Sequence, residues 1–119
     1  MKGHYLLGLP FITININSKQ IEPLIDTGFN GALLLPLRKI HALNLKRIGF
    51  TEYAMADGSI VAAEMFSAEI EWLNKKRRVG VIGSHSDFML LGMELLKNAI
   101  TTLKPSGGLL NIESDETNS

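Results

Sequence analysis

The stretch Leu24-Ile25-Asp26-Thr27-Gly28 places one carboxylate directly after two apolar residues. Upstream, isoleucines alternate with polar residues over positions 12–17, the period of two that marks a half-buried strand, and residues 20–25 form the returning strand. Asp26 is therefore expected at the end of a strand, where the following glycine permits a sharp turn or a close backbone approach. Taken alone, the Asp-Thr-Gly tripeptide is better explained as an ordinary turn than as a catalytic site, because Asp and Gly are common turn residues.

The rest of the chain is predicted to form short strands separated by turns. Residues 5–12 are apolar and favour a strand, residues 32–35 have the pattern of a strand buried on both faces, and residues 64–72 alternate between an apolar and a polar face. Short helices are expected over residues 37–45 and 93–98. Turn signals every 8–12 residues or so are typical of an all-β barrel or sandwich.

Three elements, in this order along the chain, resemble the retropepsin-like aspartic proteases, which are the retroviral proteases and their small bacterial relatives. The first is the Asp26 stretch with the apolar run 32–35 behind it. The second is Ala56-Asp57-Gly58-Ser59, a strong hairpin signal at the place of the family's flap. The third is Leu90-Leu91-Gly92 followed by residues 93–96, which is similar to the apolar-apolar-Gly motif before the family's short helix. A chance turn at Asp26 would not explain this third element.

The resemblance implies a closed acid-protease barrel with one or two short helices, one lobe per chain, and an active site at a homodimer interface. It implies that Asp26 is the catalytic carboxylate, that the Thr27 hydroxyl hydrogen-bonds across the dimer, and that Gly28 lets the loops and the substrate come close. The segment 56–59 would be the flap that closes over a peptide. Residues 90–92 would support the catalytic loop from below.

The implied chemistry needs two carboxylates. Two neighbouring carboxylates in an apolar cleft cannot both ionise readily, so they share a proton, as is known for aspartic proteases. The ionised member takes a proton from water while the protonated member polarises the peptide carbonyl. Because the chain has one Asp-Thr-Gly, we expect a homodimer in which a two-fold axis supplies the second Asp26. Phe29 departs from the retroviral pattern, which usually has Ala after the triplet.

The expected function is that of an aspartic endopeptidase acting on an extended peptide or protein substrate. The alternative is a catalytically weak or inactive dimeric peptide-binding module of the same fold, because fold does not dictate function. Residues 1–112 are expected to form the protease domain, and the polar residues 113–119 a disordered tail.

Other functions find less support in the sequence. The twelve basic and twelve acidic side chains cancel, and the basic run 75–78 is best explained as a solvated turn, so we expect neither nucleic-acid nor membrane binding. The residues 84–87 include Ser, His and Asp, but adjacent residues cannot form a serine triad. The scattered histidines lack metal-ligand spacing and no phosphate loop is present, so no metal or cofactor is expected. The absence of cysteine fits a reducing compartment, and a cytoplasmic location is expected.

Overall fold

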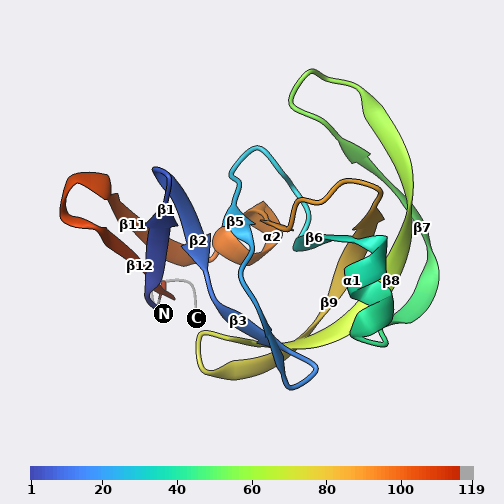
Figure 1. Cartoon of the computed structure of the whole chain (residues 1–119), viewed down its shortest axis with the longest axis horizontal. Coiled ribbons are helices and arrows are strands. Elements are labelled where there is room, and N and C mark those ends of the chain that lie inside the picture. Colours follow the sequence, from blue (N-terminus) through green and yellow to red (C-terminus); the bar gives the residue numbers. More distant parts are fainter. Residues whose placement is uncertain (116–119) are drawn as a thin grey trace.

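The computed structural model describes residues 1–115. Segments in which apolar and polar residues alternate, and short segments of apolar residues, fold into strands (Figure 1). The strands are β1 (Gly3–Leu6), β2 (Leu9–Ile12), β3 (Ile14–Ile16), β4 (Lys19–Ile21), β5 (Leu24–Ile25), β6 (Leu33–Pro36), β7 (Lys46–Ala54), β8 (Ile60–Trp72), β9 (Lys75–Ser84), β10 (Leu90–Leu91), β11 (Ala99–Lys104) and β12 (Leu109–Ser114). The helices are α1 (Leu37–Ala42), α2 (Met93–Leu96) and the 3-10 turn η1 (Pro105–Gly107). The predicted all-β class with two short α-helices is confirmed.

One sheet carries most of the molecule and curls around the core as a half-barrel (Figure 1). Its strand order is β1-β2-β5-β10-β6-β9-β8-β3-β4, with β7 also paired to β8. Strands β11 and β12 form a separate hairpin, which is tied to the N-terminus because the Met1 and Ile112 backbones exchange two hydrogen bonds. The N-terminus therefore lies beside β12.

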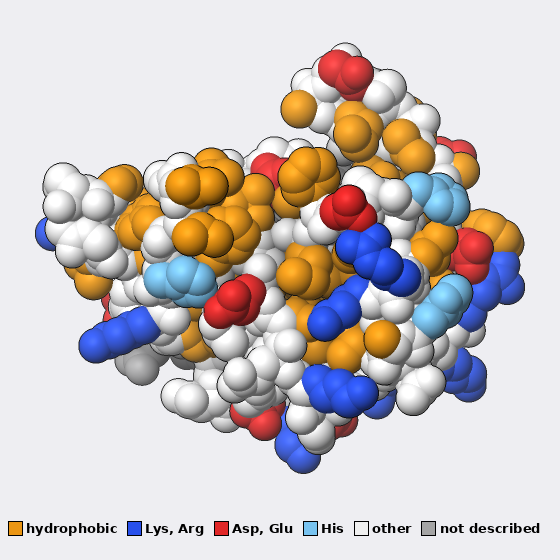
Figure 2. Space-filling view, in the orientation of Figure 1, with side chains coloured by type: hydrophobic (Ala, Val, Ile, Leu, Met, Phe, Trp, Pro, Cys, Tyr) orange, Lys and Arg blue, Asp and Glu red, His pale blue; other side chains and the backbone are white. Residues whose placement is uncertain are grey.

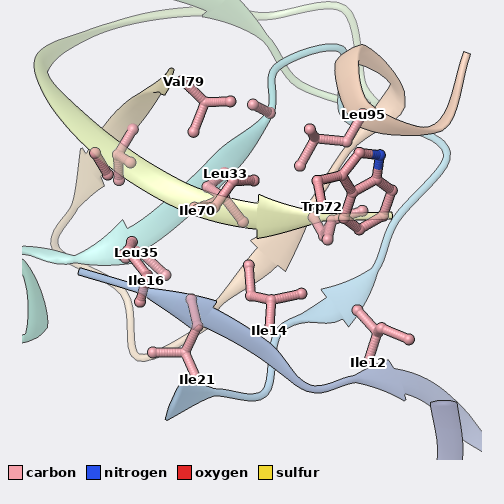
Figure 3. Close-up of a cluster of buried hydrophobic side chains, with 14 of the residues drawn as sticks. Ile12, Ile14, Ile16, Ile21, Leu33, Leu35, Ile70, Trp72, Val79 and Leu95 are labelled. Carbon is pink, nitrogen blue, oxygen red and sulfur yellow. The ribbon is translucent and has the colours of Figure 1, made fainter. Parts of the chain in front are cut away.

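The core is built from the inward faces of these strands (Figure 3). Ile12, Ile14 and Ile16 point inward with at most 2% of their surface exposed, as their alternation with polar residues predicts. Leu33 on β6 is fully buried, and all four residues of β6 are buried, as expected for a strand covered on both faces. Trp72 closes one end of this cluster beside α2.

The long strands β7 and β8 form a hairpin that projects from the body of the molecule (Figure 1). Its turn is closed by hydrogen bonds from the Met55 amide to the Ser59 carbonyl (2.8 Å) and from the Gly58 amide to the Met55 carbonyl (3.0 Å). Gly58 has a φ of 88°, a conformation that glycine adopts without strain. The hairpin predicted from Asp57-Gly58 is therefore present.

Two stretches differ from the sequence-based expectation. Residues 5–12 do not form one strand, because the chain reverses at Leu7-Gly8 and pairs β1 with β2. At the other end, β12 continues through Ser114, since Glu113 and Ser114 pair with the first residues of β11, so the strand extends past the predicted start of the tail. Residues 116–119 lie outside the described part of the chain.

Within residues 1–115, no helix has the length and apolar character needed to cross a bilayer.

Candidate active site

Asp26 directly follows β5, and its position is fixed by β10, a strand more than 60 residues later in the chain. Strand β10 lies between β5 and β6, parallel to the first and antiparallel to the second. The Asp26 amide donates to the Leu91 carbonyl at 2.9 Å, and the Leu24 amide donates to the Met89 carbonyl at 2.8 Å. The position of Asp26 is thus set by a non-local strand pairing.

The loop after Asp26 is organised by the carboxylate itself. The Gly28 amide donates to Asp26 Oδ1 at 2.9 Å, and the Phe29 amide donates to the Asp26 carbonyl at 3.2 Å. These bonds leave the Asp26 side chain half-buried, while Thr27 and Gly28 are exposed at the surface. Among residues 1–115, the Thr27 hydroxyl has no hydrogen-bond partner.

Gly92 lies directly beneath this loop. A Cβ at position 92 would come within 2.4 Å of two backbone oxygens, those of Phe29 and Gly31. The same oxygens accept hydrogen bonds from the Met93 amide (2.8 Å) and the Glu94 amide (3.2 Å) at the start of α2. Only glycine at position 92 leaves room for these backbone contacts between the start of α2 and the Asp26 loop.

A pocket of about 340 Å³ opens beside Asp26. Its wall is mainly apolar and combines the loop after Asp26, the β7–β8 hairpin and the segment before β10. The lining residues are Asp26, Gly28, Phe29, Leu34, Tyr53, Ala54, Met55, Ala56, Ser84, Ser86, Phe88 and Leu90. The pocket therefore brings together one carboxylate and the residues of three distant segments.

Phe29 joins the loop to the hairpin. Its side chain is 4% exposed and meets the Tyr53 ring edge-on, with 6.2 Å between the ring centroids. The ring also lies close to Gly31 and Gly92, whose missing side chains provide the space for it. The bulky residue after the Asp-Thr-Gly triplet is thus accommodated by two glycines and forms part of the pocket wall.

The segment 56–59 lies at the tip of the β7–β8 hairpin. Ala56 lines the Asp26 pocket, whereas Asp57, Gly58 and Ser59 do not. The Asp57 carboxylate accepts hydrogen bonds from the Ser59 hydroxyl (2.6 Å) and the Ser59 amide (2.9 Å). These bonds, the hydroxyl first, hold the pKa of Asp57 below its ordinary value, because they favour the ionised form.

Several pocket residues were not singled out from the sequence. Tyr53 lies on β7, and Phe88, in the segment before β10, is 67% exposed. Ser84 and Ser86 lie in the polar loop and share a hydrogen bond of 2.8 Å between their hydroxyls. The alternation of Tyr53 along its strand was a usable signal, while the serines carried none.

The other large cavity, about 450 Å³, shares Tyr53, Ser84 and Ser86 with the Asp26 pocket and extends under the hairpin toward α1.

Within residues 1–115, no three His, Cys, Asp or Glu side chains gather closely enough to hold a metal ion.

The fold is that of the retropepsin-like aspartic proteases. Its solved neighbours include the EIAV protease in complex with the inhibitor HBY-793, with a TM-score of 0.65 and 18% identity over 79% of this chain and 90% of that one. A retropepsin-like aspartic protease from Rickettsia conorii has a TM-score of 0.64 and 18% identity over 95% of this chain and 86% of that one.

The simian foamy virus (mac) protease has a TM-score of 0.54 and 14% identity over 73% of this chain and 91% of that one. No protein-family model matches the sequence, and no curated protein matches it. The resemblance inferred from the three sequence elements is thus confirmed as a likeness of fold.

Proposed function

We propose that this protein is an aspartic endopeptidase that works as a homodimer, with one Asp26 from each chain. The observation that carries the proposal is the position of Asp26: a carboxylate at the mouth of an apolar pocket, on a loop held from below by β10 and Gly92. A turn with a purely structural role would not need a loop held in this way. It would also not need a hairpin and a pocket beside its carboxylate.

The second carboxylate comes from the partner chain. Among residues 1–115, Asp26 is the only acidic residue that lines its pocket, and the exposed loop beside it leaves the carboxylate accessible from outside the chain. Two such loops meeting across a two-fold axis would place the carboxylates side by side. Thr27 fits this interface, since its hydroxyl is exposed and lacks a partner among residues 1–115.

The paired carboxylates then activate water. Close approach of two like charges raises the cost of ionising both, so the pair holds one proton. The ionised carboxylate removes a proton from water as the oxygen attacks the peptide carbonyl, and the protonated carboxylate gives its proton to the carbonyl oxygen. The tetrahedral intermediate then collapses: the C–N bond breaks, the leaving amine takes the proton that came from water, and a hydroxyl of the intermediate returns a proton to the other carboxylate, so the pair again holds one proton. The reaction consumes no cofactor.

The substrate is an extended peptide that lies between the Asp26 loop and the β7–β8 hairpin. The hairpin reaches the pocket through Ala54, Met55 and Ala56, so it acts as the flap that closes over the peptide. The pocket wall is apolar apart from Asp26 and two serines, which favours a large apolar side chain next to the cleaved bond.

The test compares the wild type with Asp26→Asn on a mixed peptide library between pH 4 and 7. The substitution keeps the size of the side chain and an acceptor for the Gly28 amide, so the loop should keep its shape. Thr13→Val serves as the control: this half-buried residue does not line the Asp26 pocket, and the change removes only a hydroxyl that donates to Glu22 at 3.3 Å. Cleavage by the wild type and the control, but not by Asp26→Asn, is expected. Equal cleavage by all three, or none by the wild type, would contradict the proposal and favour the peptide-binding module.

A further inference from the structure

Strand β8 has a neighbouring strand on only one side near the tip of the hairpin. Strand β9 pairs with β8 as far as Ile82, which lies opposite Met65. The last two residues of β9, Gly83 and Ser84, pair with β6 instead. Residues 60–64 of β8 therefore pair with β7 and, within residues 1–115, with no other strand. We call residues 60–64 the open edge.

The backbone groups of three residues in the open edge point away from β7. In an antiparallel pair of strands, opposite residues alternate between those that exchange hydrogen bonds and those that do not. The Met55 amide donates to the Ser59 carbonyl at 2.8 Å, so the next pair, which contains Ile60, does not exchange hydrogen bonds. The same alternation directs the N–H and C=O groups of Ala62 and Glu64 outward. In the described part of the chain, these outward groups have no hydrogen-bond partner.

The open edge lacks the features that usually protect an exposed strand from pairing. Protected edges are very short, carry Lys or Pro, or contain a bulge. Strand β4, at one end of the sheet, has three residues and begins with Lys19. Strand β7 carries Lys46 and Arg47 and has a bulge after Arg47. The open edge reads Ile-Val-Ala-Ala-Glu, and the Ile60 side chain is 68% exposed, so this edge is a template for a further strand.

The cavity of about 450 Å³ runs along the open edge. Residues 61–64 line it, and so do residues 83–86, which end β9 and begin the following loop. An extended chain between these two segments would take the place of β9 beside β8. Leu37, Phe50 and Tyr53 add apolar side chains to the wall. Figure 2 shows apolar side chains gathered on the hairpin where it projects from the body of the molecule.

This cavity adjoins the Asp26 pocket without being part of it. Tyr53, Ser84 and Ser86 line both, whereas no residue of the open edge lines the Asp26 pocket. A peptide that leaves the Asp26 pocket past the two serines can therefore reach the open edge. Because an extended chain advances about 3.3 Å per residue, pairing along the whole open edge takes about five residues of peptide.

We propose that the open edge is a second peptide-binding site, at which an extended segment of the protein substrate adds to the sheet as a strand beside β8. The inference rests on the proposed function, because its occupant belongs to the substrate that is cleaved at Asp26. Hydrogen bonds to Ile60, Ala62 and Glu64 supply affinity that does not depend on side chains. The apolar wall of the cavity favours apolar residues at every second position of the segment.

A second copy of this chain is a poorer occupant of the open edge. The open edge of another copy carries β7 on its far side, so it would enter the cavity as a two-stranded hairpin. Neighbouring strands lie about 4.8 Å apart, and residues 83–86 border the cavity. The space beside β8 therefore suits a single strand.

Hydrogen exchange of single amides, followed by NMR, tests whether a strand is added. The probe is a peptide of about seven residues, capped at both ends, in which valine and lysine alternate. The protein is the Asp26→Asn variant, so that the probe is not cleaved. We expect the probe to slow exchange of the Ile60, Ala62 and Glu64 amides at least about tenfold.

Methylated probes test the direction of the bonds. In an added strand, every second backbone N–H of the probe points at β8 and the others point away. N-methyl groups on one alternate set should therefore weaken binding at least about tenfold, and those on the other set by less than about threefold.

Ala62→Pro tests the same site from the side of the protein. Proline removes an outward N–H and is tolerated on an open strand edge, whereas the matched control Ala62→Ser keeps the N–H. We expect Ala62→Pro to weaken probe binding at least about tenfold and Ala62→Ser by less than about threefold. Slow exchange of the Met55 and Gly58 amides, which bond within the turn, reports that the hairpin of each variant is intact.

Kinetics with the wild type test whether the occupant is substrate. A cleaved library peptide is lengthened by about five residues of alternating valine and lysine, on either side of the cleaved bond. Lengthening on one side should lower KM at least about threefold with little change in kcat, because the added contacts are equal in the ground and transition states. Ala62→Pro should remove this gain, and Ala62→Ser should keep it.

Three results would overturn the proposal. The first is unchanged exchange of the three edge amides at about 1 mM probe. The second is equal weakening, or none, by the two methylated sets. The third is exchange that slows with protein concentration in the absence of probe, which would make a second copy the occupant. The two proposals fail separately: Asp26-dependent cleavage without edge protection refutes the open edge alone, and edge protection without cleavage by the wild type refutes the peptidase and the assignment of the occupant to its substrate.

Discussion

Replacing Gly92 with alanine is the most stringent test of how the Asp26 loop is supported. The backbone at Gly92 has φ −114° and ψ −170°, which any residue can adopt, so the cost of Gly92→Ala is steric. The new Cβ would lie 2.4 Å from the Phe29 and Gly31 oxygens, and neither backbone atom can rotate away. Overpacking of this kind costs about 1–3 kcal/mol.

The displaced oxygens also accept two hydrogen bonds from α2, which are worth about 1 kcal/mol each. The expected loss for Gly92→Ala is therefore about 3–5 kcal/mol, a large part of the roughly 5–15 kcal/mol that stabilises a typical domain. Urea unfolding at one fixed protein concentration measures it, since dimerisation makes stability depend on concentration. Gly107→Ala is the matched control, because nothing lies within 4 Å of its Cβ position. A loss below about 1 kcal/mol for Gly92→Ala, with activity intact, would refute the reasoning, since that is the cost of an ordinary substitution.

Three further predictions concern the hairpin and the core. Tyr53→Ala removes the edge-on contact with Phe29 and should raise KM by about 2- to 10-fold, whereas Tyr53→Phe should not; equal KM values in peptide kinetics would contradict this. The pKa of Asp57 is lowered by the bonds from Ser59, so these bonds should persist above the ordinary carboxyl pKa of about 3.9 and be lost as pH falls through the lowered value. The Ser59 amide resonance reports this, and a midpoint at or above about 3.9 would disagree. Leu33→Ala, at a fully buried position, should cost about 2–5 kcal/mol in urea unfolding, and a cost under about 1 kcal/mol would be inconsistent with its burial.

Sequence patterns correctly predicted the strands and turns that are determined by neighbouring residues. The alternation of Ile12, Ile14 and Ile16 correctly indicated which face is buried, and Asp57-Gly58 correctly indicated a hairpin turn. The first short helix was placed at its true start, and it ends at Ala42, three residues before the predicted end. In each case the signal and the structure arise from the same few residues.

Tertiary features were beyond local patterns. The β1–β2 turn was missed because Leu7 is a poor turn residue, and only Gly8 hinted at it. The contribution of Phe29 to the pocket wall depends on the distant glycine at position 92 and on Tyr53 across the hairpin. Leu90-Leu91 was recognised as a sequence motif. Its pairing with β5 on one side and β6 on the other could not be predicted, because no short segment of the sequence determines which distant strands pair.

The most direct test of the central claim, that two Asp26 carboxylates form one site, is a subunit-mixing titration. Wild-type chains are mixed with Asp26→Asn chains at constant total concentration, allowed to exchange, and assayed for peptide cleavage. If each site needs both carboxylates, activity follows the square of the wild-type fraction and falls to about one quarter at equal mixing. If activity instead falls in simple proportion, to about one half, each chain acts alone and the shared site is wrong.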